Sequence, residues 1–341
     1  MAEAFSLKDD LFNAKTIGQL AAEYAAGIPG FDADRFAAEA LSGFPDRELM
    51  ARMEWMADCL EPQLAADFPT MADQLEAAMP PPLDPTLKAD DFGQFIYAMP
   101  GILAVRHGLE DHRDRALDLL YAATQRFSME FYIRAFLNRW PQETLARLAI
   151  WAEDDNYHVR RLVSEGTSPR LPWAKAVTLQ TAQRVPFLDK LHADPTRYVT
   201  RSVANHLNDI AKTEPGVVLS RLQDWAAQGR QTGKELAWMS RHALRTLVKD
   251  GHAGALAHLG YRGDVLVTAT LDLGAARHAI GDAIPVSCIL SADQDLPVMV
   301  DYRIRFVRPG GKTAEKVFKL KVSKITAGTP LPLHKAHKLK V

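Results

Sequence analysis

Carboxylates that lie among arginines are the first feature of the sequence that could do chemistry. Arg161 is followed by Glu165 four residues later, and Arg201 is followed by Asp209 eight residues later. Residues at these spacings share one face of a helix, so each acid lies on the same face as an arginine. A third acid, Glu130, lies in the aromatic stretch FSMEFY. The pattern predicts carboxylates within a positively charged surface.

The arginines belong to a pattern that recurs about every 40 residues between positions 155 and 249. Three columns of equivalent positions follow from it: Arg161, Arg201 and Arg241; Glu165, Asn205 and Arg245; Asp209 and Lys249. A fixed period near 40 is typical of HEAT-type helical repeats, which stack because one unit cannot bury its own apolar face. Equivalent positions should therefore line up along one surface.

These columns predict a track of cations made by Arg160, Arg161, Arg201, Arg241, Arg245 and Lys249, with Arg197 beside it. Cations roughly 10 Å apart can follow a phosphate backbone, where neutralisation releases counterions. The alternative is that the arginines cap helices or pair with carboxylates of neighbouring repeats.

The acids need a reason of their own, because phosphate repels a carboxylate in a DNA-binding groove. Breaking an N-glycosidic bond builds positive charge on the sugar, which a carboxylate stabilises while it orients water. Salt bridges are the alternative for Glu130, Glu165 and Asp209. Trp173 follows Leu171-Pro172 and is interpreted either as an exposed stacking platform or as a core residue.

Motifs for other chemistries are absent. The sequence has no phosphate loop, no G-x-G-x-x-G, no G-x-S-x-G and no H-E-x-x-H. The pair His334 and His337 is interpreted as part of a solvated tail, and His206, His242 and His252 as structural. Cys59 and Cys288 lie in segments of different character, so neither a disulfide nor a cysteine-based metal site is expected. No metal and no cofactor are predicted.

The 341 residues are 47% apolar and 24% charged, as in soluble globular proteins, and lack a membrane-spanning run or signal peptide. A cytoplasmic location is expected. Residues 1–120 hold 9 Lys and Arg against 22 Asp and Glu, residues 121–260 hold 19 against 13, and residues 261–341 hold 13 against 7. This split favours a basic working surface with an acidic end, although solvated helix faces of differing composition would also produce it.

The chain up to about residue 260 predicts helices. An acidic set of short helices occupies residues 1–80 and ends at the Pro80–Pro82 run, which cannot be helical. Helices are expected again over Phe92–His107 and, as one aromatic-rich stretch, over Asp114–Trp140. Helix pairs then continue to about Leu259.

After residue 261 the apolar pattern changes to period two. Strands are predicted at 265–271, 284–290, 298–306 and 316–322, with a hairpin turn at Arg308–Lys312. The prediction is a mainly α chain: a HEAT-like solenoid, residues 1–260, followed by a small Ig-like β-sandwich, residues 262–341. Exposed lysines in the last strands, Lys316, Lys319, Lys321 and Lys324, suit either solubility or DNA contact.

Three stretches carry a resemblance to a known family. RRLVSEG with the following PW, SVANHLND, and the stretch from Trp238 to Lys249 resemble the AlkC/AlkD superfamily of DNA alkylation repair glycosylases, and more closely its AlkC branch. The resemblance covers roughly residues 5–260. The β-rich end resembles the Ig-like domain of one AlkC subgroup.

This resemblance implies a monofunctional glycosylase that removes cationic N3-alkylated bases, such as 3-methyladenine or 3-methylcytosine, from double-stranded DNA. It implies a monomer that acts without extruding the base, unlike most glycosylases. By position, Glu165 and Asp209 match the family's acidic pair, Glu130 a further acid, Trp173 an aromatic contact and Arg161 a DNA backbone contact. The AlkD branch uses two tryptophans and only one is matched, so that scheme does not carry over whole. The alternative is a non-catalytic HEAT-repeat module that binds nucleic acid or protein.

Overall fold

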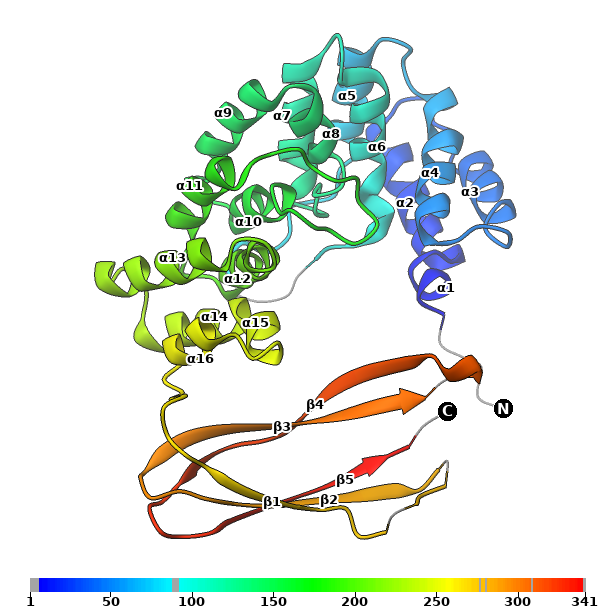
Figure 1. The fold of residues 1–341 in the computed structure, drawn as a ribbon. Coiled ribbons are helices and arrows are strands. Elements are labelled where there is room, and N and C mark those ends of the chain that lie inside the picture. Colours follow the sequence, from blue (N-terminus) through cyan, green and yellow to red (C-terminus); the bar gives the residue numbers. More distant parts are fainter. Residues whose placement is uncertain (1–5, 88–91, 276, 280, 308, 340–341) are drawn as a thin grey trace. The chain divides into compact units, whose positions relative to one another are not determined.

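The computed structural model describes residues 6–87, 92–275, 277–279, 281–307 and 309–339. Its contacts divide the chain into two compact units, Met1–Ala243 and Leu244–Val341 (Figure 1). The first unit is helical, and the second begins with two short helices and continues as strands. The predicted fold class, a helical repeat followed by a small β-domain, is confirmed. In the described part of the chain, no helix combines the length and the hydrophobicity that crossing a membrane requires.

The helices of the first unit are short and separated by turns. Their bounds are α1 (Leu7–Leu11), α2 (Ala14–Gly27), α3 (Ala33–Ser42), α4 (Leu49–Leu60), η1 (Glu61–Gln63), α5 (Phe68–Ala77), η2 (Phe95–Ala98), α6 (Met99–Leu103), η3 (Ala104–Gly108), α7 (Arg113–Thr124), α8 (Ile133–Arg139), α9 (Pro141–Trp151), α10 (Tyr157–Gly166), α11 (Thr181–Leu191), α12 (Arg197–Ala211), α13 (Pro215–Gln228) and α14 (Gly233–Ala243).

The repeat appears as two layers of helices (Figure 1). Helices α10, α12 and α14 lie side by side in one layer, while α9, α11 and α13 pack against them in the other. Val159 and Val199, which the repeat aligns, are both fully buried, as are Val163 and Val203. The apolar half of the repeat therefore holds the layers together, and its polar half lies on the opposite face of the same helices.

Local signals fix where these helices begin and end. The Asn156 side chain accepts a hydrogen bond from the His158 amide and caps α10. Pro215 occupies the first turn of α13, where its missing N–H costs nothing. Gly229 ends that helix at φ 63°, a conformation that favours glycine. These signals fix the start of α10 and both ends of α13.

The predicted helical stretch Asp114–Trp140 is wrong as a single element, because residues 125–132 form a turn between α7 and α8. Phe127 pairs with the backbone of Gly93 instead of continuing the helix, and its ring packs on Phe95 at 4.8 Å. Gly93 has φ 70°, and a Cβ there would clash with the Arg126 carbonyl, so only glycine permits the pairing. Tertiary pairing thus overrides helix propensity and leaves Glu130 in a turn.

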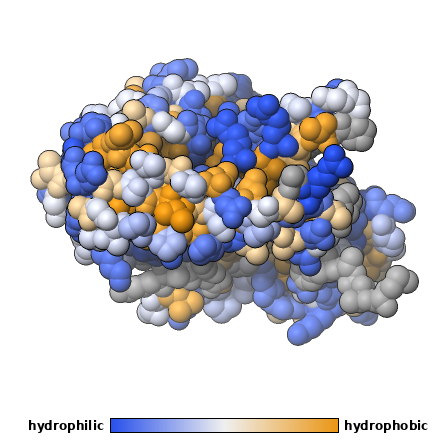
Figure 2. Space-filling view, turned by 60° about the horizontal axis from the view of Figure 1, so that its bottom comes forward, coloured by the Kyte–Doolittle hydropathy of each residue, from blue (hydrophilic) through white to orange (hydrophobic). Residues whose placement is uncertain are grey.

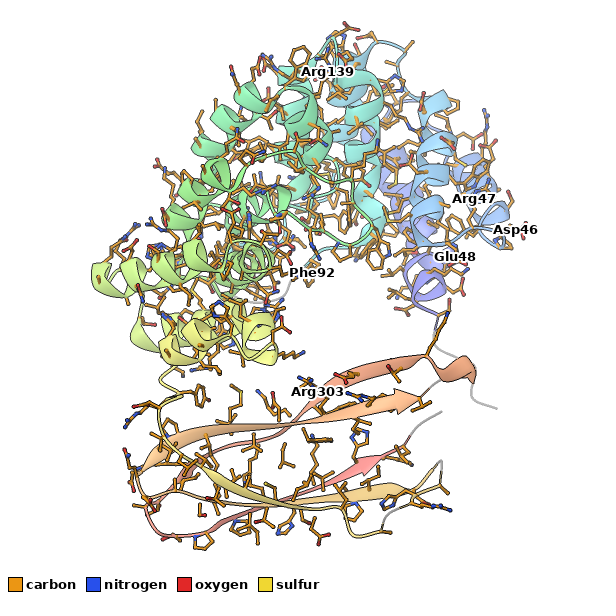
Figure 3. All side chains as sticks on the ribbon, in the orientation of Figure 1. Asp46, Arg47, Glu48, Phe92, Arg139 and Arg303 are labelled. Carbon is orange, nitrogen blue, oxygen red and sulfur yellow. The ribbon has the colours of Figure 1, made fainter. Side chains whose placement is uncertain are left out.

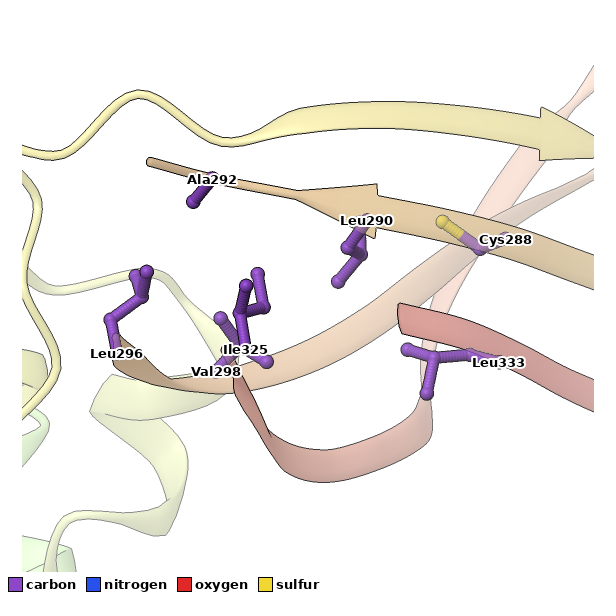
Figure 4. Packing of buried hydrophobic residues seen from close by; sticks show 7 residues of the cluster. All are labelled: Cys288, Leu290, Ala292, Leu296, Val298, Ile325 and Leu333. Carbon is purple, nitrogen blue, oxygen red and sulfur yellow. The ribbon is translucent and has the colours of Figure 1, made fainter. Parts of the chain in front are cut away.

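The second unit contains α15 (Arg245–Lys249), α16 (Ala253–His258), β1 (Thr268–Asp272), β2 (Ala283–Ser291), β3 (Leu296–Val307), η4 (Pro309–Gly311), β4 (Thr313–Ile325) and β5 (Leu331–Lys338). The strands form an antiparallel sheet of order β1-β2-β5 and an antiparallel pair β3-β4. Cys288, Leu290 and Leu333 of the first sheet face Leu296, Val298 and Ile325 of the second (Figure 4). This apolar layer is the core of the predicted sandwich.

Two expectations in this unit are corrected or limited. The interpretation of His334 and His337 as a solvated tail is wrong, since both lie in β5, where His337 accepts or donates a 2.7 Å hydrogen bond with the Tyr302 hydroxyl. The hairpin turn joins β3 and β4, but its predicted first residue, Arg308, lies outside the described residues. The change from helices to strands falls between His258 and Thr268, and the predicted domain boundary at 260–262 stays a prediction.

The surface mixes hydrophilic and hydrophobic side chains, as Figure 2 shows for one face. Most apolar exposure on a folded protein of this kind is unremarkable. Two exposed side chains of the first unit are aromatic: Phe92, which lies beside Arg161, and Trp173, which lies in the loop after α10.

Candidate functional site

The predicted acid Glu165 lies in the last turn of α10 and points toward α12. Its Oε2 accepts a hydrogen bond from the Ser202 hydroxyl on α12 and lies 3.5 Å from a guanidinium nitrogen of Arg161. Ser202 is in turn 2.9 Å from the Ser164 hydroxyl. The Glu165 side chain keeps 14% of its surface exposed, so it is largely enclosed and still reaches the surface.

Arg161 binds a second acid with the same guanidinium. Its Nη1 forms an ion pair with Oε2 of Glu130 and donates a 2.7 Å hydrogen bond to the Ser128 hydroxyl. Ser128 also donates to Glu130 Oε2, at 2.8 Å. The turn at residues 125–132 thus brings Glu130 to α10. Only 6% of Arg161 is exposed, and its guanidinium carbon lies 4.9 Å from the centre of the Tyr198 ring.

Glu130 and Glu165 are both held through one carboxylate oxygen, Oε2. Every hydrogen bond and ion pair of Glu130 and Glu165 within the described residues engages Oε2. Within the described residues, Oε1 of each glutamate makes no hydrogen bond or ion pair, although a carboxylate oxygen can accept one. One buried cation therefore holds two carboxylates through one oxygen each.

Burial controls the electrostatics of this cluster. It raises the pKa of Glu165, the charges of Glu130 and Asp209 raise it further, and the attraction of Arg161 with the Ser202 hydrogen bond only partly opposes them. Burial by itself lowers the pKa of Arg161, but the charges of Glu130 and Glu165 outweigh it and raise that pKa. Arg161 is thus always protonated, while its attraction is divided between two acids.

The third predicted acid, Asp209, lies two turns along α12 from Arg201 and is held less tightly. Its carboxylate forms a 2.6 Å ion pair with Lys212 and is 3.5 Å from the Ser168 hydroxyl. Its charge influences Glu165, so the two acids belong to one region. The predicted acids Glu130, Glu165 and Asp209 are therefore brought together by three elements: a turn, α10 and α12.

Trp173 lies in the loop of residues 167–180, which joins α10 to α11. The side chain is 70% exposed, which excludes the interpretation as a core residue. Its backbone has φ 62°, a left-handed conformation that costs about 1 kcal/mol or more for a residue with a Cβ. Strain of this kind persists only where the surrounding structure imposes it.

Buried arginines impose that structure on the Trp173 loop. Arg134 on α8 donates to the carbonyls of Gly166, Ser168 and Lys175 at 3.1, 2.9 and 2.6 Å. Arg184 on α11 donates to the carbonyls of Thr167 and Val177 at 2.9 and 3.2 Å. Burial lowers the pKa of Arg134 to about 10, with the charge of Arg184 as the second cause. Both ends of the loop are therefore fixed, and Trp173 is presented to solvent between them.

Aromatic residues that the sequence pattern did not predict lie next to Arg161. Phe92, labelled in Figure 3, packs edge-on against Tyr198 with ring centres 5.4 Å apart. The Arg161 guanidinium lies 5.5 Å from the Phe92 ring, which stays 49% exposed. Tyr198 occupies the repeat position of His158, 40 residues earlier, and Phe92 is about 70 residues distant from Arg161 in sequence. No local pattern connects these residues, so only the fold could reveal them.

The predicted cation track divides by environment. Arg160 pairs with Asp194 and donates to the carbonyls of Asp154 and Asp155 at 2.7 and 2.9 Å, and Arg197 pairs with Glu235. For these two and for Arg161 the geometry is that of the salt-bridge alternative. Along the first column, burial decreases from Arg161 through the half-buried Arg201 to the exposed Arg241.

Arg245 and Lys249 lie on α15 in the second unit, where Lys249 is exposed and Arg245 half-buried. The DNA contacts predicted for the arginines and for Lys249 stay predictions.

The histidines of the first unit have structural environments. His206 on α12 is buried, bonds the Ser164 carbonyl through Nδ1 at 3.0 Å, and has its pKa lowered to about 3 by burial. His242 stacks on Trp238 and bonds Asn205 at 2.7 Å. Across the described ranges, His, Cys, Asp and Glu form no group of three or more suited to a metal ion. The residues described around Arg161 contribute carboxylates, hydroxyls and aromatic rings.

Comparison with known proteins gives three findings. Residues 267–341 match the family described as "Uncharacterised protein YhaZ, C-terminal Ig-like domain". Over 320 residues the chain is 32% identical to the uncharacterized protein YhaZ of Bacillus subtilis strain 168, covering 91% of this chain and 84% of that one. A solved structure, the Pseudomonas fluorescens alkylpurine DNA glycosylase AlkC bound to DNA containing an abasic site analogue, is 34% identical. It superimposes with a TM-score of 0.86, covering 99% of this chain and 91% of that chain.

Proposed function

Since this chain belongs to the family of Bacillus subtilis YhaZ and the Pseudomonas fluorescens DNA glycosylase AlkC, we propose that it is a DNA glycosylase. Its substrate in this proposal is double-stranded DNA that carries an alkylated base, chiefly a cationic N3-methylated purine such as 3-methyladenine. We propose further that it acts as a monomer in the cytoplasm, on the nucleoid.

The proposed reaction needs little besides negative charge. The bond between sugar C1′ and the base nitrogen breaks, and its electron pair leaves with the cationic base, which departs neutral. The sugar is left as an oxocarbenium-like cation, which nearby carboxylates stabilise. Water then adds to C1′ and loses one proton to a carboxylate. Because the alkylated base is already a good leaving group, no strong general acid is required.

The observation that carries this proposal is the pair Glu130 and Glu165 fixed on one buried arginine. Each keeps Oε1 available, and Asp209 lies near enough to influence Glu165. A purely structural ion pair would be expected to satisfy its carboxylates fully when buried. Carboxylates that keep an oxygen for a further hydrogen bond at a partly exposed surface suit a site that binds a cationic sugar and a water.

Trp173 and Phe92 supply the aromatic part of the proposed site. An exposed aromatic ring attracts both stacked bases and cations, and a 3-methylated purine is both. Trp173 is held by a loop with two fixed ends, so its ring can meet DNA with little ordering cost. In this proposal the lesion is recognised against the surface, without extrusion of the base into a pocket.

The test is release of methylated bases from methylated duplex DNA, with the freed bases separated by chromatography. The wild type should release 3-methyladenine. We expect Glu165→Gln and Asp209→Asn to slow release on the order of 100- to 1,000-fold and to bind DNA as tightly or more tightly, because each removes a negative charge. Glu153→Gln is the matched control, since Glu153 pairs with Lys190 on an exposed surface.

The outcomes separate the alternatives. A wild-type protein that binds DNA and releases no methylated base would indicate the non-catalytic HEAT module. Variants that lose folding by circular dichroism would indicate that the acids serve structural salt bridges. Release of 3-methylcytosine or 7-methylguanine at a higher rate than 3-methyladenine would keep the enzyme and change its preferred lesion.

A further inference from the structure

The surroundings of Arg161 are those of an interior residue. Phosphate contacts are normally made by exposed cations that give up a counterion on binding. Arg161 is 6% exposed, lies on the Tyr198 ring at 4.9 Å, and already binds Glu130, Ser128 and Glu165. Its guanidinium is therefore already paired inside the protein and is not exposed to a phosphate.

We propose that Arg161 is a positioning residue, which keeps Glu130 and Glu165 ionised together and fixes their orientation for the reaction. This inference rests on the proposed glycosylase function and deepens it, because it gives the arginine of the first column a role in the acid pair. The guanidinium is suited to the task, since its planar fork can bind two acceptors at once and it does not lose its proton.

Charge explains why one arginine is needed. Two carboxylates in one partly buried region repel each other, and without a cation one of them takes up a proton. A neutral acid could neither stabilise an oxocarbenium-like sugar nor accept a proton from water. Since burial and the neighbouring acids already raise the pKa of Glu165, removing Arg161 would raise it further.

Other charged or titratable groups lie around the pair on α8, α10, α11 and α12. They are Arg134 on α8, His158 on α10, Arg184 on α11, and Tyr198, His206 and Asp209 on α12. Arg134 and Arg184 are committed to loop carbonyls, His206 is held neutral by burial, and Asp209 is an anion. Arg161 is the cation in this group that contacts both glutamates.

The test combines Arg161→Lys and Arg161→Met with a control from the same column. Lysine keeps a positive charge but cannot bind both acids in a fixed geometry. We expect the acid limb of the pH profile for single-turnover base release to move to higher pH by about one unit in each variant. The dissociation constant for DNA and its salt dependence should stay as in the wild type. In Arg241→Met, an exposed position, the acid limb should not move.

Opposite results would overturn the inference in distinguishable ways. A phosphate contact would lower the slope of log affinity against log salt by about 0.9 in Arg161→Met, leave it nearly unchanged in Arg161→Lys, and leave the acid limb in place in both. A merely structural role would reduce release equally at every pH and lower the melting temperature.

A readout that needs no activity separates this inference from the proposed function. The side-chain carboxyl of Glu165 is titrated by carbon-13 NMR, with its signal assigned by its absence from Glu165→Gln. We expect the titration to move to higher pH in Arg161→Lys and to lower pH in Glu130→Gln, where Arg161 serves one acid alone. If the wild type releases no base, the proposed function fails while this titration still decides the role of Arg161. An unmoved titration in both variants overturns the inference.

Discussion

Among single residues, Trp173 is the most informative about the proposed site. A tryptophan that is 70% exposed and held at positive φ gains little for the fold, so its side chain is available for a ligand. We expect Trp173→Ala to lower kcat/KM on methylated duplex DNA by about 5- to 150-fold, since stacking on an aromatic ring is worth about 1–3 kcal/mol per base. Single-turnover base release measures this directly.

The same substitution should leave the free energy of unfolding within about 0.5 kcal/mol of the wild type, as for other exposed positions. Ile150→Ala, also 70% exposed, is the matched control and should change neither quantity. A large loss of stability in Trp173→Ala would show that the ring supports the loop, and full activity would remove it from the proposed site.

Residue patterns predicted which acids lie near one another better than they predicted the surroundings of the arginines. Glu165 and Asp209 share helix faces with arginines in the sequence, and the structure brings both to one region with Glu130. The burial of Arg161 could not be predicted, because it depends on Tyr198 from the next repeat and on Phe92 from a distant segment. Sequence spacing shows which residues share a helix face, and it does not show what covers that face.

At the scale of elements, the loop of residues 167–180 explains how an exposed tryptophan can be held still. Arg134 donates three hydrogen bonds to its backbone from a position that is 1% exposed. We expect Arg134→Met to leave these carbonyls unpaired, destabilising the fold by about 3 kcal/mol and accelerating amide hydrogen exchange across the loop. Base release should fall with it, since Trp173 loses its fixed place.

Arg139→Met is the matched control, because Arg139 lies on the same helix and pairs with Glu110 at an exposed surface (Figure 3). Such pairs contribute about 0–1 kcal/mol, so exchange in the loop should stay unchanged. Equal exchange in wild type and Arg134→Met would mean that Arg184 and Asn138, which also bond this loop, hold it without Arg134.

Helices and strands whose residues recur with a clear sequence period were predicted. Elements that depend on pairing between distant segments were not. The repeat of about 40 residues located α10, α12 and α14, and period-two alternation located the first four strands. The turn at residues 125–132 was missed because its apolar residues continue the helical pattern, while Gly93 pairs with Phe127. Strand β5 was missed because its His and Lys side chains hide the alternation, although Leu331 and Leu333 pair with β2.

At the scale of the whole molecule, the distribution of charge suggests that the β-domain adds to DNA affinity. The first 120 residues are strongly acidic and the last 81 are basic, with 13 Lys and Arg against 7 Asp and Glu. Among the basic residues of β4, Lys324 is already paired with Asp295 at 2.8 Å, whereas Lys319 and Lys321 are exposed and two residues apart. Val300 pairs with Lys321 and Asp301 with Lys319, so a β-bulge at Leu320 separates the two lysines, and each is exposed where it could meet a phosphate.

We therefore expect the double variant Lys319→Gln, Lys321→Gln to bind duplex DNA more weakly at low salt than the wild type. The slope of log affinity against log salt should fall by about 1–2, because each lost phosphate contact removes about 0.9. Fluorescence anisotropy at several salt concentrations measures both quantities, with Lys324→Gln as the control that Asp295 already neutralises. If the slope is the same in all three proteins, these lysines protect the edge of the sheet from self-association, and DNA is held by the helical repeats alone.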